Sequence, residues 1–342
     1  ELRISNSQYG VLQSSVAIVN TVLPLLAGLF VDTFGTQVGS ILATSLIAAG
    51  YVLAATSTSL ASFPLMVVGY VMYGLGSGSI TVVQGAILSH WFRGKGLAIA
   101  MGLEVATSRL ASSSRGLASY LSMATVVLIS QWTGFYGWAF WFAALLCVLS
   151  WVVNLLYVLF MRYLHEEHGV ERQELARKKA FHPRNLLYFP APYWFIIGIV
   201  FTLGSCWTIF LHFNTEMVKL RFGHDDQTSA YIASVAQVLP IFFAPFQGYL
   251  HDFYGYRATT AMMSTLTFIA SMLLFLWWPH FSPIIGMAIF SVSLTIGPVA
   301  IFSSVPLVLA NTVVGTGLGV YKSTLNVGVS LLDIVAGMLQ DL

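Results

Sequence analysis

The chain has 342 residues, of which 57% are hydrophobic and only 8% are charged, and its mean hydropathy is +0.80. Soluble globular domains carry about 25% charged residues, so most of this surface cannot face water. Fifteen basic against thirteen acidic residues leave no positive excess for nucleic acid. Two lone cysteines, Cys147 and Cys206, make neither a disulfide framework nor a metal site. The composition therefore favours an integral membrane protein.

Ten mostly apolar stretches follow one another along the chain, each long enough to cross a bilayer, which takes about 20 residues. Backbone groups inside a bilayer must bond internally, and these runs do not alternate with a period of two, so we expect helices. The sequence thus predicts an all-α membrane protein. The predicted spans are approximately 9–31, 38–57, 63–90, 96–130, 136–161, 188–213, 229–250, 258–277, 283–309 and 313–339.

Basic residues orient these spans, because cytoplasmic loops are enriched in Lys and Arg. One set of alternate loops holds nine of them and the other set holds three, Arg3, Lys219 and Arg221. The first set, which includes the one long connection, is therefore expected in the cytoplasm. We predict an N-terminal half at 1–162, a cytoplasmic linker at 163–187 and a C-terminal half at 188–342. His165 and His168 are interpreted as solvated linker residues rather than metal ligands.

A short motif occurs twice, as Gly28-Leu-Phe-Val-Asp-Thr-Phe-Gly35 and as Gly248-Tyr-Leu-His-Asp-Phe-Tyr-Gly255, with an offset of 220 (248−28 and 255−35). Each copy closes one predicted span and turns into the next. Gly-x-x-x-Asp-x-x-Gly at such positions resembles the loop signature of the major facilitator superfamily. The resemblance implies that family's fold, with two six-helix halves and alternating access. Matching the repeats indicates that helices 2–11 of the fold are present, without the first and twelfth.

The motif residues are the predicted cytoplasmic latch. The first glycine of each copy permits close helix packing, and the last one supplies a turn. The carboxylates of Asp32 and Asp252 are expected at the amino-terminal end of a helix from the other half, where the helix dipole favours an anion. Basic residues usually follow the family's first copy, but here Thr36 and Gln37 do. Only Arg257 after the second copy keeps the charge, which predicts a weaker first latch.

Ionisable residues inside a span are functional candidates, because burying a charge in the bilayer is costly. Arg109 lies near the middle of span 96–130 among small residues, and a guanidinium can hold a carboxylate with two hydrogen bonds. We predict that it contacts substrate, with a structural ion pair as the alternative. Glu104 is predicted to receive an amine or a proton. Arg115 is interpreted as structural or as reaching the lipid headgroups.

Lys322, Asn326 and Asp333 share one face of span 313–339, at spacings of four and seven. We place Lys322 nearer the non-cytoplasmic end and Asp333 nearer the cytoplasm, with Asp333 as a gate or latch residue and the other two as substrate-binding residues. Weaker lining candidates are Gln84, Trp207, His212 and Asn214, for which ordinary helix packing is the alternative.

Within the superfamily, three segments resemble the branch of lysosomal dipeptide uniporters: 9–28, 91–109 and 326–337. The resemblance implies that Arg109 contacts the carboxylate end of a dipeptide. Members of that branch tend to carry an acidic residue where this chain has Gly78, so the amine end would need Glu104.

The expected function is therefore secondary transport of small zwitterions, dipeptides above all, by uniport, and not an enzymatic activity. No ATP-binding motif, cofactor or metal site is expected. Two alternatives stay open: a proton-coupled carrier of organic anions or monocarboxylates, and a transport-dead receptor or scaffold. The resemblance implies a lysosomal or vacuolar membrane, with the plasma membrane as the alternative, and compatibility with a glycosylated accessory membrane subunit.

Overall fold

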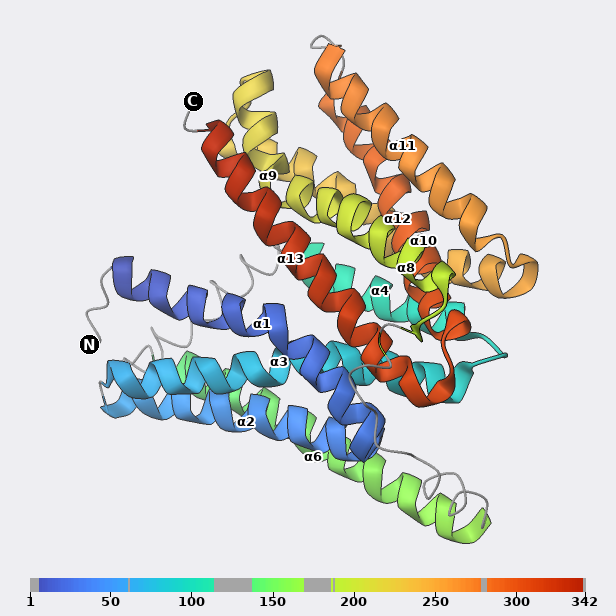
Figure 1. Ribbon diagram of the computed structural model, residues 1–342. Coiled ribbons are helices and arrows are strands. Elements are labelled where there is room, and N and C mark those ends of the chain that lie inside the picture. Colours follow the sequence, from blue (N-terminus) through green and yellow to red (C-terminus); the bar gives the residue numbers. More distant parts are fainter. Residues whose placement is uncertain are drawn as a thin grey trace. The chain divides into compact units, whose positions relative to one another are not determined.

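A computed structural model describes residues 6–60, 62–113, 137–168, 186, 188–277 and 282–340, and these residues are almost entirely helical (Figure 1). Span residues 114–130 with Arg115, and linker residues 169–185, lie outside this described part, as do the side chains of His165 and His168. The elements are α1 (Asn6–Phe34), α2 (Thr36–Leu60), α3 (Phe63–Phe92), α4 (Leu97–Ser113), α6 (Gly137–His168), α8 (Ala191–Ile199), η2 (Val200–Gly204), α9 (Ser205–Phe222), α10 (Asp226–Tyr254), α11 (Arg257–Trp277), α12 (Pro283–Val308), η3 (Asn311–Val313) and α13 (Val314–Gln340).

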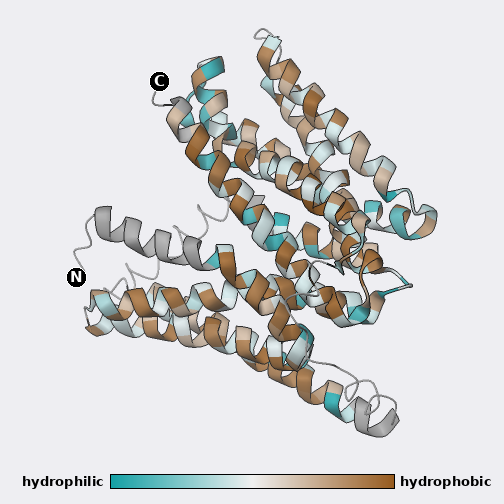
Figure 2. Cartoon of the chain, viewed as in Figure 1, coloured by the Kyte–Doolittle hydropathy of each residue, from teal (hydrophilic) through white to brown (hydrophobic). Residues whose placement is uncertain are grey.

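Seven helical segments of the described residues are long and apolar enough to cross a membrane. They confirm seven of the predicted spans, and the predicted span 188–213 continues to Phe222 as one run of α8, η2 and α9. The other three predicted spans fall on α1, α4 and α13, which are helical in the structure. Hydrophobic residues cover most of the helical surface and hydrophilic ones gather near helix ends, as Figure 2 shows.

The described helices fall into two compact units, each considered by itself. Unit 1 comprises 1–87, 124–189 and 310–323, and unit 2 comprises 88–123, 190–309 and 324–342. In unit 1, α2 and α6 pack along one another. In unit 2, α12 packs against α10 and α11, and α10 packs against α4. Each unit thus combines helices of one predicted half with a segment of the other, and the predicted boundary at the linker stays a prediction.

Close backbone contacts join helices inside each unit. In unit 1, an ideal Cβ added to Gly28 would collide with the backbone of Gly315, and one added to Gly319 would collide with the carbonyl of Pro24. In unit 2, a Cβ added to Gly248 would likewise collide with the carbonyl of Ala98. Small residues let helix backbones approach this closely in membranes.

The same register occurs in both units. Gly102 of α4 lies against the Ala244 carbonyl of α10, just as Gly319 lies against Pro24. Residues of α1 and α10 match at an offset of 220 (248−28, 244−24), and those of α4 and α13 match at 217 (319−102, 315−98). The internal repeat predicted from the motif is therefore present as two equivalent helix pairs, α1 with α13 and α10 with α4.

Glycine turns separate the paired helices from those that follow. Gly35 ends α1 with φ of 93°, and Gly255 ends α10 with φ of 73°, both in the left-handed region. Residues with a Cβ rarely adopt this conformation. The last glycine of each motif copy therefore makes the tight turn that the sequence predicts.

Candidate functional site

Asp32, at the end of α1, caps the amino terminus of α13 within unit 1. Its Oδ1 accepts a hydrogen bond from the Gly315 N–H at 2.9 Å, and its Oδ2 accepts one from the Thr316 N–H at 2.6 Å. The Thr316 hydroxyl donates a further bond of 2.6 Å to Oδ2. The first N–H groups of a helix have no partner within the helix and carry the positive end of its dipole. The carboxylate therefore satisfies these donors.

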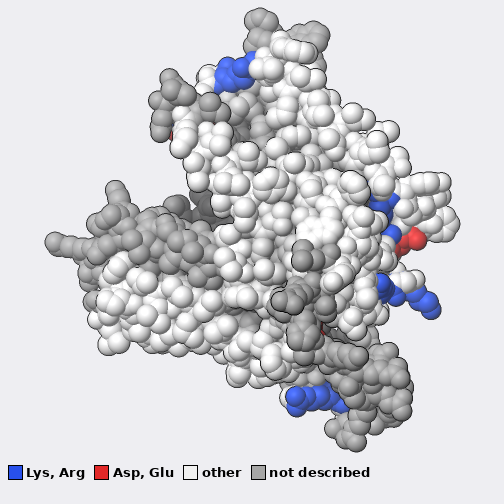
Figure 3. Space-filling view, viewed as in Figure 1, with Lys and Arg blue, Asp and Glu red and all other residues white. Residues whose placement is uncertain are grey.

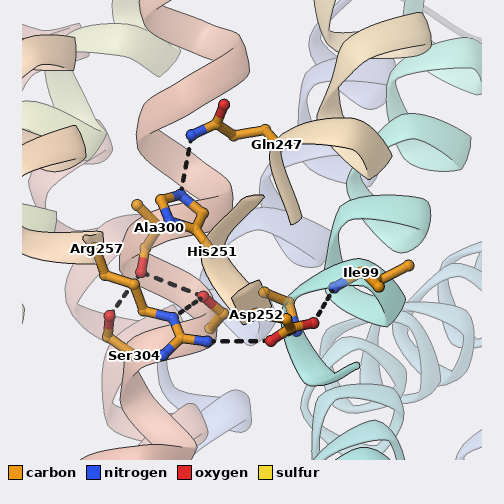
Figure 4. A network of polar contacts seen from close by, with 9 residues as sticks. Ile99, Gln247, His251, Asp252, Arg257, Ala300 and Ser304 are labelled. Carbon is orange, nitrogen blue, oxygen red and sulfur yellow. Dashed lines mark hydrogen bonds and ion pairs between the residues drawn. The ribbon is translucent and has the colours of Figure 1, made fainter. Parts of the chain in front are cut away.

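Asp252, at the end of α10, caps α4 within unit 2 in the same manner. It accepts hydrogen bonds from the N–H groups of Ala98 and Ile99 at 3.1 and 3.0 Å. Its third donor is Arg257, whose Nη2 lies 3.2 Å from Oδ1 in an ion pair where both side chains are only 18% exposed. Figure 4 shows the Arg257 and Asp252 side chains pointing toward each other, with Ile99 on the other side of the carboxylate.

The two carboxylates have equivalent positions but different third donors. The offset of 220 places Gln37 at the position of Arg257, and the offset of 217 places Thr316 at the position of Ile99. The third donor to Asp32 is therefore a hydroxyl of the helix that it caps, whereas the third donor to Asp252 is a guanidinium. The predicted placement of both aspartates at helix amino termini agrees with this geometry, while their role as a latch stays a prediction.

Further polar contacts surround Arg257 in unit 2. Its Nε donates to the Ser303 hydroxyl of α12 at 3.2 Å, and the Ser304 hydroxyl donates to the Ala300 carbonyl (Figure 4). His251, which is 2% exposed, lies with Nε2 3.2 Å from the Gln247 side-chain nitrogen. The bonds of Arg257 to Ser303 and Asp252 hold the start of α11 on α12 and α10, whereas the other two contacts lie within α12 and within α10.

Arg109 lies on the face of α4 that packs against α10. Gly102 and Ala106 belong to this face, and Ala106 is buried with Ala244 and Val299. Continuing the antiparallel register from Gly102 and Ala244 by seven residues on each helix brings Arg109 level with Gln237. Gln237 is a polar residue of α10 that the sequence analysis did not single out.

Glu104 projects differently from Arg109. It is half-buried on α4, and one of its carboxylate oxygens is fully buried. It follows Gly102 by two positions, or about 200° around the helix, so it lies away from the face that packs on α10. The two candidate residues are therefore on different sides of α4.

Trp207 of α9 is 5% exposed and lies inside the helix packing of unit 2. Its indole N–H donates to the Ser293 hydroxyl at 3.0 Å, and Ser293 in turn bonds to Ser264. The ring occupies the space left by Gly297, where an added Cβ would collide with it. This geometry favours the packing alternative for Trp207 over substrate contact, because the indole N–H already has a buried partner.

Gln84 lines a crevice of unit 1 between α2, α3 and α6, with a volume of about 290 Å³. Asn154 of α6 lines the same crevice and donates to the Thr44 hydroxyl at 3.1 Å. Apolar walls come from Ile47, Ile80 and Val83. Gln84 is exposed there, which leaves its predicted lining role open.

The three polar residues of α13 divide between the units, with Lys322 in unit 1 and Asn326 and Asp333 in unit 2. Asp32 caps α13 at Gly315 and Thr316, so Lys322 lies nearer than Asp333 to the motif that is predicted to be cytoplasmic. The predicted ends of this helix, with Asp333 nearer the cytoplasm, do not agree with that placement. Asp333 lies 3.3 Å from His212 of α9.

Two residues that make polar contacts in the structure, Thr316 and Arg93, were not singled out from the sequence, because nothing in their sequence context marks such a role clearly. Thr316 has no charge and sits in a glycine-rich stretch, and only its position at a helix start could have marked it. Arg93, counted only as a cytoplasmic charge, donates at 2.7 Å to the carbonyl of Leu309, the residue that follows α12. Among the described residues, no three side chains of the metal-binding types gather in one place.

The helical spans and the sparsely charged surface in Figure 3 define a multi-pass membrane protein with two equivalent carboxylate-capped helix pairs. The sequence profile of the Major Facilitator Superfamily matches residues 1–332. The chain belongs to the major facilitator superfamily and is a secondary transporter rather than an enzyme.

Similar proteins include the lysosomal dipeptide transporter MFSD1 of Bos taurus, 26% identical over 354 residues, covering 100% of this chain and 73% of that protein. The MFSD1 of Danio rerio is 26% identical over 342 residues, covering 94% of this chain and 70% of that one. The crystal structure of the transporter FucP in the outward conformation superposes with a TM-score of 0.73 at 14% identity, covering 99% of this chain and 84% of FucP. The last similarity supports the fold alone.

Proposed function

We propose that this transporter carries small zwitterions, dipeptides above all, by uniport and alternating access in a lysosomal or vacuolar membrane. The observation that carries the proposal is similarity along the whole chain to proteins named lysosomal dipeptide transporters. Arg109 lies in α4, within the predicted span 96–130, where a charged side chain is costly unless it has a function.

Arg109 is the proposed ligand of the substrate carboxylate. A guanidinium can form two parallel hydrogen bonds with a carboxylate, and it stays charged at every physiological pH. Arg109 lies level with Gln237 of α10, so a second polar side chain of unit 2 is available beside it. Glu104 is the proposed partner of the amine end, with Lys322 and Asn326 as further lining residues.

The two capped helix pairs are the proposed cytoplasmic latch. Asp32 and Asp252 hold helix amino termini at the cytoplasmic end, as the charge count orients the chain. Opening of that end requires each carboxylate to leave its backbone donors. Hydrogen bonds to charged groups each contribute about 1.5–3 kcal/mol, so their loss is large enough to bias a conformational equilibrium.

The proposal is tested by uptake of labelled dipeptides and free amino acids into vesicles carrying the full-length protein. We expect saturable dipeptide uptake that persists with a protonophore, falls at least about tenfold in Arg109→Ala, and is partly retained in Arg109→Lys, which keeps the charge but loses the planar fork. Absence of dipeptide uptake by the wild type contradicts the substrate assignment. Full uptake by Arg109→Ala removes Arg109 from the site.

A proton-coupled carrier of organic anions is the second candidate. The observation that favours it is the His212–Asp333 pair, because His and Asp side chains within membrane helices can serve as proton sites. In this case uptake of a monocarboxylate would collapse with a protonophore, while dipeptides would not compete for it.

A further inference from the structure

His212 and Asp333 are an ionisable pair between two membrane helices of unit 2. The Nδ1 atom of His212 lies 3.3 Å from Oδ1 of Asp333, within hydrogen-bond range. The two side chains are 37% and 38% exposed, so the pair is neither sealed in the protein nor fully solvated. It is separate from the Asp252–Arg257 contact and from Arg109.

Two glycines packed against side chains of the neighbouring helix hold the pair in register. An added Cβ at Gly328 of α13 would collide with the Ser205 hydroxyl of α9, and Gly204 packs against Leu325. From Gly204 to His212 and from Leu325 to Asp333 the step is the same, eight residues. The helices α9 and α13 therefore run parallel with a fixed register, and the His212–Asp333 contact follows from this packing.

The pair lies in the half of the membrane away from the cytoplasm. Asp333 follows Gly315 by 18 positions, or roughly 27 Å at 1.5 Å per residue, and Asp32 marks the Gly315 end as cytoplasmic. His212 is about two thirds of the way along the segment Ala191–Phe222, which begins after the cytoplasmic linker. Both helices place the pair toward the non-cytoplasmic side.

Other ionisable groups on the neighbouring elements are few. On α9, Glu216 follows His212 by one turn, and Lys219 beyond it pairs with Asp226 of α10. The nearest other charge on α13 is Lys322, three turns toward the cytoplasm. The other ionisable residues of these two helices are Cys206 and Arg221 of α9 and Tyr321 of α13. Of the elements that pack on α9, α12 and η2 contain no ionisable residue, and α10 adds Tyr231, Tyr249, His251, Asp252 and Tyr254.

We infer that the His212–Asp333 pair is a proton-binding site that makes transport faster when the non-cytoplasmic side is acidic. A histidine side chain ordinarily changes charge between pH 5 and 8. With neutral imidazole the pair carries one negative charge, and with imidazolium it is a neutral ion pair. The proton can enter and leave from the same side, so the site needs no net proton transport.

The effect on transport follows from the cost of removing a charge from water. Alternating access closes the non-cytoplasmic ends of the helices and takes this partly exposed pair out of water. A single buried negative charge is costly, whereas a charge-paired carboxylate is less so. Protonation of His212 therefore favours closure on that side and speeds the passage of substrate toward the cytoplasm.

The test is uptake by the full-length protein in vesicles as a function of pH on the non-cytoplasmic side. We expect wild-type uptake to rise roughly threefold or more between about pH 7.5 and about pH 5.5. His212→Gln leaves the Asp333 carboxylate without a cation, so this variant should lose the rise and keep the slow wild-type rate of pH 7.5. Asp333→Asn removes the negative charge, so this variant should be faster than wild type near pH 7.5 and should not rise further on acidification. His224→Gln, in the loop before α10, is the matched control and should keep the wild-type rise. A flat wild-type profile, or a rise that survives in His212→Gln, overturns the inference.

A substrate-free measurement separates this inference from the proposed function, on which it rests only in assuming a transport cycle. Amide hydrogen exchange of α9 and α13 is compared between wild type and His212→Gln at the same pH. We expect greater protection in the wild type near pH 5.5 and equal protection near pH 7.5. This difference can appear even if no dipeptide is transported, whereas equal protection at both pH values counts against the proton site.

Discussion

The hydroxyl of Thr316 donates a 2.6 Å hydrogen bond to Asp32, where the equivalent carboxylate, Asp252, is served by the guanidinium of Arg257. Each carboxylate therefore has three donors, two of them backbone N–H groups. The Asp32 cap depends on a neutral donor, Thr316, in the helix α13 that Asp32 caps. The Asp252 cap depends on a cation, Arg257, in α11, the helix that follows Asp252 in the chain.

Replacing Thr316 by Val should destabilise the α1–α13 contact. The Val side chain has nearly the same shape but no hydroxyl, and a hydrogen bond to a charged group contributes about 1.5–3 kcal/mol. Thr316→Ser keeps the donor and is the matched control. Thermal unfolding in detergent measures the difference, and equal melting temperatures for the two variants would mean that the hydroxyl contributes nothing.

Replacing Arg257 by Gln should destabilise unit 2, because the side chain would lose its ion pair with Asp252 and its bond to Ser303. We expect a loss of about 1.5–3 kcal/mol, with Arg257→Lys intermediate because an ammonium keeps the charge but cannot span both partners. The reciprocal variant Gln37→Arg places a cation at the equivalent position beside Asp32. Unfolding of all three is measured together, and an Arg257→Gln protein as stable as wild type would contradict the prediction.

Replacing Gly248 by Ala should force α10 away from α4, since the new Cβ would collide with the Ala98 carbonyl. Overpacking of this kind costs about 1–3 kcal/mol. Gly198→Ala is the control, because no atom lies within 4 Å of a Cβ added there. The two variants are compared by unfolding and by uptake, and the prediction fails if Gly198→Ala is the more damaging change.

Replacing Trp207 by Phe should lower stability without abolishing transport. The indole bond to Ser293 is lost while the Ser293 hydroxyl keeps its bond to Ser264, so we expect the cost of one hydrogen bond, about 0.5–1.5 kcal/mol. Retained uptake in vesicles with a lowered melting temperature would support a packing role. Loss of saturable uptake in a variant that unfolds like the wild type would instead return Trp207 to the substrate site.

Much of the fold could be predicted from the sequence because it depends on composition and on a local motif. Long apolar runs must form helices in a bilayer, and the glycines at 35 and 255 mark turns that need positive φ. The two offsets, 220 and 217, align residues that form equivalent contacts in the structure. Asp32 and Asp252 could be placed at helix amino termini for the same reason, since an anion is stabilised there.

The remaining site geometry depends on side-chain packing that periodicity does not encode. Trp207 is polar at one atom only, and whether that atom faces a cavity or Ser293 depends on the room left by Gly297 on another helix. The predicted ends of span 313–339 conflict with the alternation of the ten predicted spans, which puts the start of this span on the expected cytoplasmic side. The contact with Asp32 fixes the direction, and the pairing of His212 with Asp333 follows from the register of α9 and α13.

The main-chain donors at both caps have a consequence for the way such proteins diverge. Ala98, Ile99 and Gly315 donate through their backbone N–H groups, which every amino acid except proline would also supply at these positions. Substitutions at Ala98 and Ile99 therefore need no compensating change at Asp252, whereas a Cβ added to Gly315 would collide with Oδ1 of Asp32. Analyses that infer contacts from correlated substitutions between positions would give little signal for this interaction, even though the carboxylates themselves tolerate no replacement without loss of the bonds.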